Sequence, residues 1–390
     1  HYCGDVPYIC GNCNVTVEQV GALVGPSGAH LVAGLEGGYV AEQLARGKNA
    51  GIHKAELLQL ADEKYPVAAE TFEDILKAAN NGAMPDKIAL LTPRQVIPAS
   101  LVEYCENLFG KENVVDAQDV FFQQKYEKSP AEIELVRQAS VISDAMMRVM
   151  LAVLEPGKLE TQVAAWGYFA ARELGAEELG LDIIVGSGEA NRSLIGKALN
   201  REIKRGDWVH LGVAAKVDGL NSCIRRSVIA VESPADVTAE QKYWFDLLEG
   251  AYKTGYESYC QVARENLPAK LQEQSLVDYF AAHADEVSKR IGRPVDLAHQ
   301  KPYTGTHNSG YTECQEFYGA ITLESENSLG YRFVTMLDVA LRGIGNHWDD
   351  VVIPGFDYLV IENTTVKEGP KVETTTLVPI NVQALVGNAD

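Results

Sequence analysis

A strong helix start about one third of the way along the chain constrains the fold more than any other feature of the sequence. Ser129 can cap a helix, Pro130 suits its first position, and Glu132 can complete a capping box. Apolar residues then recur at helical spacing as far as Val153. Because the character of the sequence changes here, we place a domain boundary just before this helix.

The length of the chain agrees with two domains, because 390 residues exceed the usual size of one. We expect a smaller domain of mixed α/β structure over residues 1–126 and a larger domain over residues 127–390. In the first, residues 22–24 and 30–33 flank a Gly-Pro-Ser-Gly turn and predict a hairpin.

The larger domain alternates strand pairs with helix pairs twice, which indicates two similar α+β halves. The predicted strands are residues 208–217, 223–231, 332–341 and 351–361. The predicted helices beyond the first are residues 160–174, 238–262 and 270–291.

Composition and charge exclude several classes of function. Hydrophobic residues make up 46% of the chain and charged residues 23%, as in a globular protein with a core. No apolar run reaches the length of a membrane span, and the segment from His1 to Cys13 does not resemble a secretory signal. A net charge of -20 disfavours binding to nucleic acid or anionic lipid.

The cysteines indicate a reducing environment. There are seven, an odd number scattered along a long chain, so we expect a cytoplasmic protein rather than a disulfide framework. Cys10 and Cys13 form an isolated C-x-x-C pair without a second pair or a His pair, so we expect them to be small core residues rather than zinc ligands.

Several motifs follow one another in a recognisable order. They are KSPAEIELVRQASVISD, PGKLETQVAA, IIVGSGEAN, IKRGDWVHLGVAAKVDGLNSCIRRS, HNSG and WDDVV. In order and spacing they resemble the creatinase, prolidase and aminopeptidase P family over about residues 128–363, and the first domain is more loosely similar. The resemblance implies a "pita-bread" fold for the second domain, of α+β class, and a homodimer.

Peptidases of that family bind two metal ions through two Asp, one His and two Glu. The matching positions here are Gly212, Cys223, His307, Leu337 and Asp349. Only the His is retained, and Gly and Leu side chains cannot bind a metal. The family's auxiliary histidines correspond to Tyr303 and Cys314, and the creatinase catalytic His has no counterpart among residues 190–196. The resemblance therefore implies a divergent member without the dinuclear site.

Three interpretations of Cys223, His307 and Asp349 remain open. In the first, Cys223 is a nucleophile, His307 its base, and Asp349 orients the ring. In the second, the three residues bind a single zinc or other divalent ion. In the third, they are a remnant that packs without reacting.

Further polar residues are candidates for substrate binding. Arg225 and Arg226 point to opposite faces of a strand, so one of them can reach the site and bind a substrate carboxylate. Tyr303 and His347 are the other predicted substrate contacts, and Glu313 and Glu316 flank His307.

We therefore expect a hydrolase that acts on a C–N bond of a small amino-acid-like or peptide substrate, without a cofactor or with one zinc or other divalent ion. One alternative is an inactive member that serves as a binding module. The other is a metal-dependent Xaa-Pro peptidase with an unusual site.

Overall fold

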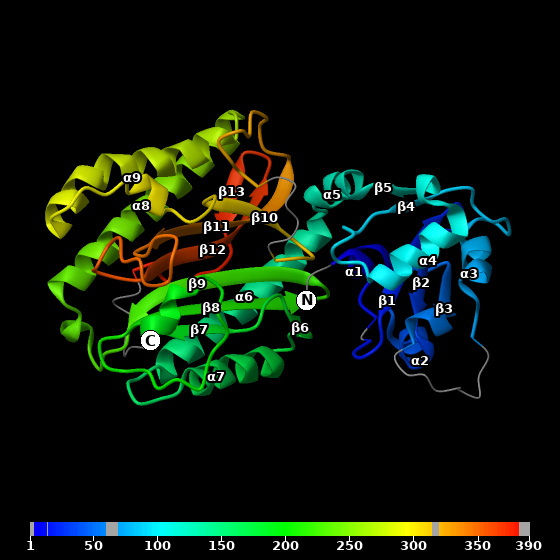
Figure 1. Ribbon diagram of the computed structural model, residues 1–390, viewed down its shortest axis with the longest axis horizontal. Helices are drawn as coiled ribbons and strands as arrows, with labels where there is room; N and C mark the ends of the chain where they lie inside the picture. The colour runs from blue at the N-terminus through cyan, green and yellow to red at the C-terminus, as the bar shows by residue number, and fades with distance from the viewer. Residues whose placement is uncertain (1–3, 14, 60–68, 314–319, 382–390) are drawn as a thin grey trace. The chain divides into compact units, whose positions relative to one another are not determined.

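The computed structural model describes residues 4–13, 15–59, 69–313 and 320–381, and the chain divides into two compact units, His1–Lys125 and Tyr126–Asp390 (Figure 1). Within these described ranges, none of the helices has both the length and the apolar character that a membrane crossing requires.

The first unit contains a three-stranded sheet built on the predicted hairpin. Strand β1 (Val20–Gly25) pairs antiparallel with β2 (Gly28–Ala33), and β2 pairs parallel with β3 (Gly51–Lys54). A separate parallel pair consists of β4 (Ile88–Leu90) and β5 (Val114–Asp116). The helices are α1 (Asp5–Cys10), α2 (Leu35–Leu44), α3 (Phe72–Ala79), α4 (Ala99–Phe109) and α5 (Gln118–Tyr126). Cys10 and Cys13 lie buried in an apolar cluster, as expected.

The second unit begins with the predicted long helix, α6 (Pro130–Val153). The hydroxyl of Ser129 accepts from the Glu132 backbone N–H, and the Glu132 carboxylate accepts from the Ser129 N–H at 2.6 Å. This reciprocal pair satisfies two backbone donors that would otherwise lack partners at the helix start. The capping box read from the sequence is confirmed.

An eight-stranded sheet forms the centre of the second unit. Its main strand order is β10-β11-β12-β9-β8-β6, with β13 beside β12 and β7 beside β8. The strands are β6 (Glu178–Leu179), β7 (Ile184–Ser187), β8 (Trp208–Val217), β9 (Leu220–Ile229), β10 (Thr306–Ser309), β11 (Arg332–Arg342), β12 (Tyr358–Glu368) and β13 (Lys371–Thr374). The remaining helices are α7 (Glu160–Glu173), α8 (Ala239–Glu265) and α9 (Lys270–Ile291). Helix α6 packs on β8 and β9, and α8 on β11 and β12, which gives the two α+β halves (Figure 1).

The last long strand lies further along the chain than the sequence suggested. We expected residues 351–361, but β12 begins at Tyr358, and Pro354 and Gly355 lie in a turn. Proline has no N–H to donate to a sheet and fixes its own φ, so the extended pattern is broken there. Because of this shift, β12 contains the carboxylate of Glu362, whereas Asp349 lies before the strand.

The sheet has two faces with different surroundings. Leu337 packs among apolar residues of α8 and α9, and the Asn363 side chain donates to the Tyr252 hydroxyl of α8 at 2.8 Å. We call this side the helix face. Because side chains alternate along a strand, the neighbours Asp338 and Glu362 point the other way. We call that side the site face.

Candidate functional site

One register row of the sheet concentrates charge on the site face. Asp338 of β11 pairs with Glu362 of β12, Glu362 pairs with Arg225 of β9, and Arg225 pairs with Gly212 of β8. The row is nearly closed to water, since Asp338 is 3%, Glu362 1% and Arg225 6% exposed. Four strands therefore place two carboxylates, a guanidinium and a glycine side by side.

The guanidinium of Arg225 is held from several directions. Its Nη1 donates to Asp338 Oδ2 at 2.9 Å and its Nε to His210 Nε2 at 3.1 Å. The hydroxyls of Tyr303 and Tyr358 accept at 3.1 and 2.7 Å, and the Leu194 carbonyl accepts at 2.8 Å. Burial opposes the charged form of Arg225, but the surrounding phenols and carboxylates outweigh it and raise its pKa. Arg225 is thus a permanent buried cation.

Potential metal ligands meet beside this row. Cys223, Glu313 and Glu362 each offer a ligand atom within 4.8 Å of the others, and His307, Asp338 and Glu362 do the same. Glu362 belongs to both groups. Thiol, imidazole and carboxylate donors together suit zinc and similar divalent ions.

Glu362 has the surroundings expected of a metal ligand. Neither of its carboxylate oxygens has a hydrogen-bond partner in the described structure, although both are buried. Its nearest cationic contact is Arg225 Nε, at 3.5 Å. Burial and then the negative charge of Asp338 raise the pKa of Glu362 well above its usual value. A buried carboxylate is costly unless it is paired or coordinates a metal, so this group fits a bound cation.

The His307 ring is oriented for coordination. Its Nδ1 lies 3.1 Å from the Asn308 carbonyl oxygen, which can only accept, so Nδ1 carries the hydrogen of this contact. In the neutral ring Nε2 then has a free lone pair, and it lies 3.8 Å from Glu362 Oε1. A hydrogen bond at one ring nitrogen that leaves the other for a metal is common in metal sites.

Cys223 does not have the surroundings of a nucleophile. It is fully buried, and burial, followed by the nearby Glu362 and Glu313, raises the pKa of its thiol well above the usual value. The nucleophile interpretation requires the opposite shift. A metal ion, by contrast, deprotonates a thiol that it binds.

Of the remaining residues predicted from the sequence, some lie at the charged row and others lie away from it. Asp349 and His347 lie exposed in the connection between β11 and β12, and neither belongs to the ligand groups found among the described residues. Tyr303 reaches the row, but its hydroxyl already contacts Asp338, Tyr358 and Arg225. The five donors of Arg225 face protein atoms, which argues against the predicted role in substrate binding. Cys314 and Glu316 lie outside the described residues.

Sequence reasoning missed Glu362, Asp338, Tyr358 and His210. One signal pointed to Glu362: it directly follows the apolar run from Tyr358 to Ile361, and a strand with such a run is buried on both faces, as β12 is. A carboxylate in such a strand needs a partner. The position assigned to Leu337 was one residue early, since Leu337 faces the helices and Asp338 faces the site.

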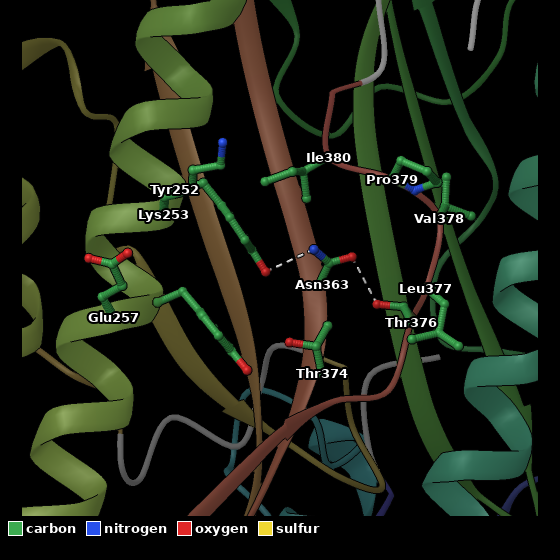
Figure 2. A pocket seen from close by; sticks show the side chains of 11 residues that line it. Tyr252, Lys253, Glu257, Asn363, Thr374, Thr376, Leu377, Val378, Pro379 and Ile380 are labelled. Atoms are coloured by element: carbon green, nitrogen blue, oxygen red, sulfur yellow. Dashed lines mark hydrogen bonds between the residues drawn. The ribbon is translucent and has the colours of Figure 1, made fainter. Parts of the chain in front are cut away.

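A cavity of about 320 Å³ lies on the helix face. Figure 2 shows its lining by Tyr252 and Glu257 of α8, by Asn363, and by the segment from Thr374 to Ile380. Asn363 joins the two walls, because it donates to Tyr252 and accepts from the Thr376 hydroxyl at 2.9 Å. It lies on the face opposite to Glu362, so this cavity is separate from the ligand groups.

Comparison with known proteins agrees with this architecture. Residues 134–301 match metallopeptidase family M24. The chain is 27% identical over 228 residues to an Xaa-Pro dipeptidase of Pyrococcus horikoshii, covering 57% of this chain and 61% of that protein. It is 28% identical over 262 residues to an Xaa-Pro dipeptidase of Pyrococcus furiosus, covering 63% and 70%. These matches agree with the resemblance to the creatinase, prolidase and aminopeptidase P family.

Solved structures confirm the fold. The prolidase from Pyrococcus horikoshii has a TM-score of 0.72 at 18% identity and covers 96% of this chain and 92% of its own. The X-Pro aminopeptidase from Thermotoga maritima has a TM-score of 0.70 at 19% identity and covers 96% and 90%. The second unit is therefore the pita-bread domain that the sequence motifs predicted.

The comparisons also correct one expectation. We expected no cofactor, but the matching family is one of metallopeptidases. The expectation rested on Gly212, Leu337 and Asp349, and it overlooked the carboxylates of Asp338 and Glu362. The donor atoms beside the row fit a metal ion, as the unpartnered oxygens of Glu362 show.

Proposed function

We propose that this protein is a metal-dependent peptidase that hydrolyses the C–N bond of short peptides. The observation that carries the proposal is that two groups of potential ligands, Cys223 with Glu313 and His307 with Asp338, share the buried carboxylate of Glu362, which has no hydrogen-bond partner among the described residues. Two similar proteins are Xaa-Pro dipeptidases, which makes dipeptides with a C-terminal proline the first substrates to test.

The chain's own residues have distinct roles in this proposal. Glu362 is the ligand common to both groups, Cys223 of one group and His307 of the other are its partners in holding the ion, and Asp338 is fixed by Arg225 and Tyr303. When bound, such an ion supplies hydroxide from water at neutral pH and polarises the carbonyl to be cleaved. Glu313 takes the proton of the attacking water and returns it to the amine leaving group. The buried surroundings keep bulk water away and strengthen these electrostatic effects.

A hydrolysis assay tests the proposal. Purified protein is freed of metal, supplied with Zn²⁺, Co²⁺ or Mn²⁺, and incubated with Ala-Pro and with Ala-Ala while free amine is measured. We expect metal-dependent cleavage that falls at least about a hundredfold in Glu362→Gln, because a ligand is lost. Asp349→Asn is the matched control, since Asp349 is exposed in a turn, and it should keep full activity. A loss in the control but not in Glu362→Gln would reverse the assignment.

A binding module without turnover is the second candidate. One observation favours it: Arg225, Asp338, Glu362, Cys223 and Glu313 are all buried, so a substrate finds little open space beside them. If dipeptides protect the metal-loaded protein against heat but are not cleaved with any of the three ions, this candidate replaces the peptidase.

We also propose a homodimer in a reducing, cytoplasmic environment. The dimer follows from the family resemblance, and the environment is supported by Cys10, Cys105, Cys223 and Cys260, which form no disulfide within the described part of the chain. Sedimentation at micromolar concentration should give twice the mass of the 42.5 kDa chain. A monomer would contradict the dimer.

A further inference from the structure

We propose that the guanidinium of Arg225 acts as a built-in cation that limits this site to a single divalent ion. The inference rests on the proposed function only in requiring that the ligand groups bind metal. It concerns the number of ions that the site binds and the residue that limits this number. It is tested by measurements of metal binding rather than by enzymatic turnover.

The row of charged residues divides into two halves. The half formed by Asp338 and Glu362, with His307 and Cys223 close by, supplies donor atoms. The half formed by Arg225 and Gly212 supplies a positive charge and no ligand atom. Gly212 itself offers no ligand atom, and Nε2 of the neighbouring His210 on β8 already accepts from Arg225, so a second ion placed there would face the guanidinium of β9.

Gly212 makes room for this arrangement. A Cβ atom at Gly212 would lie 3.2 Å from Cγ of Arg225 and 3.1 Å from Cδ1 of Ile184. Both contacts are tighter than ordinary van der Waals packing, so a side chain at this position would have to displace one of the two neighbours. The glycine therefore leaves room for the stem of Arg225 to lie against β8 while its guanidinium donates to Asp338 of β11.

Any movement of the Arg225 guanidinium away from this position would break its hydrogen bonds and leave buried polar groups unpaired. The guanidinium donates to Asp338, His210, Tyr303, Tyr358 and the Leu194 carbonyl, and its side chain is almost fully buried. Both Asp338 oxygens are occupied, by Arg225 and by Tyr303, whereas both Glu362 oxygens are unoccupied. The Glu362 oxygens are therefore left for one ion, and Cys223 with Glu313 in one ligand group and His307 in the other offer its further ligands.

Metal stoichiometry tests this inference. Protein freed of metal is dialysed to equilibrium against Zn²⁺ or Co²⁺, and the bound ion is counted by elemental analysis. We expect one ion per chain in the wild type and in Arg225→Lys, which keeps the charge. With Co²⁺ we also expect a thiolate-to-cobalt absorption band in the near ultraviolet, which Cys223→Ser should abolish.

The decisive variant exchanges the cation for a ligand. In Gly212→Asp/Arg225→Ala a carboxylate replaces the guanidinium, and the bound ions should rise from one to two per chain. Arg205→Ala is the matched control, because Arg205 is an exposed arginine paired with Glu232, and it should stay at one ion. Circular dichroism and thermal unfolding establish that each variant is folded.

Each outcome has one meaning. Two ions in the wild type, or one ion in a folded double variant, overturns the inference. If the double variant does not fold, the wild-type and Arg225→Lys ratios decide, and a ratio of two in either overturns it. No bound ion in the wild type overturns the inference and the metal-dependent function together. One ion without peptide cleavage leaves the inference intact and removes only the peptidase.

Discussion

The hydroxyls of Tyr303 and Tyr358 lie 2.6 Å apart and connect the buried arginine to a carboxylate. Tyr303 donates to Asp338, so Tyr358 must donate to Tyr303 while it accepts from Arg225. In this series of hydrogen bonds each of the two hydroxyl hydrogens has one acceptor. Such fully satisfied networks fix the positions of their members, whereas removing one member leaves a buried polar group unpaired.

Replacing Tyr358 with Phe should therefore destabilise the protein. The change removes one of the two acceptors of Arg225 Nη2 in a buried site, and we expect the free energy of unfolding to fall by about 2 kcal/mol. Urea unfolding measures this loss. Tyr331→Phe is the control, since Tyr331 is exposed, and it should change the stability by less than about 0.5 kcal/mol. Equal effects of the two substitutions would contradict the role of the network.

The thiol of Cys223 should be unreactive in the folded protein. Burial and neighbouring carboxylates raise its pKa, so little thiolate exists at pH 7. Iodoacetamide should label Cys260, which is partly exposed, before Cys223, and mass spectrometry of the digested protein distinguishes the two. Cys223 should react only after unfolding. Rapid labelling of folded protein at this position would restore the nucleophile interpretation.

At the scale of elements, the sequence predicted most helices and strands but not the place of β12. The capping boxes at Ser129 and Thr238 fixed two long helices, because local hydrogen-bond chemistry determines where a helix starts. The start of β12 depends on a turn that encloses Pro354, and on pairing with β9 and β11, which are distant in sequence. That pairing brings in Glu362 rather than Asp349. Cys223 and His307 were therefore assigned from the sequence motifs, whereas Glu362 had only its place after an apolar run to mark it.

In the first unit a chain of hydrogen bonds links the β1–β2 hairpin to β3. Ser27 Oγ lies 2.7 Å from His30 Nε2, His30 Nδ1 lies 2.8 Å from His53 Nε2, and His53 Nδ1 lies 2.9 Å from Glu70. Burial, followed by the neighbouring His53, lowers the pKa of His30. Protonation of His30 is therefore unfavourable while the first unit is folded.

The first unit should lose stability in mild acid for this reason. The unfolded chain binds a proton at His30 near pH about 6.5, whereas the folded chain binds it only at lower pH, so stability falls as the pH drops below that value. Unfolding curves at pH 7 and pH 5 should show a smaller difference in His30→Gln than in the wild type. His299→Gln, at an exposed histidine, should keep the wild-type difference. An unchanged pH dependence in His30→Gln would exclude His30 as its source.

For the whole molecule, the order of motifs along the sequence predicted the pita-bread fold, because each half repeats an arrangement of strands and helices that packs only in a few ways. The site could not be predicted to the same extent. It is assembled from β9, β10, β11 and β12, and its contents depend on the register between strands that are far apart in the chain. A shift of one residue exchanges Leu337 for Asp338 and reverses the face to which each side chain points.

Because four strands share the ligand groups, metal binding should stabilise the second unit as a whole. An ion bound to the folded state alone adds about 2.7 kcal/mol when its free concentration is a hundred times its Kd. For a unit of this size, that corresponds to a rise in melting temperature of roughly 5–10 °C. Calorimetry of protein with Zn²⁺ and after removal of Zn²⁺ by a chelator measures the shift. Glu362→Gln should lose most of it, because the buried carboxylate shared by both ligand groups is gone, whereas Asp349→Asn should keep it. The same shift in Glu362→Gln as in the wild type would place the ion elsewhere in the chain.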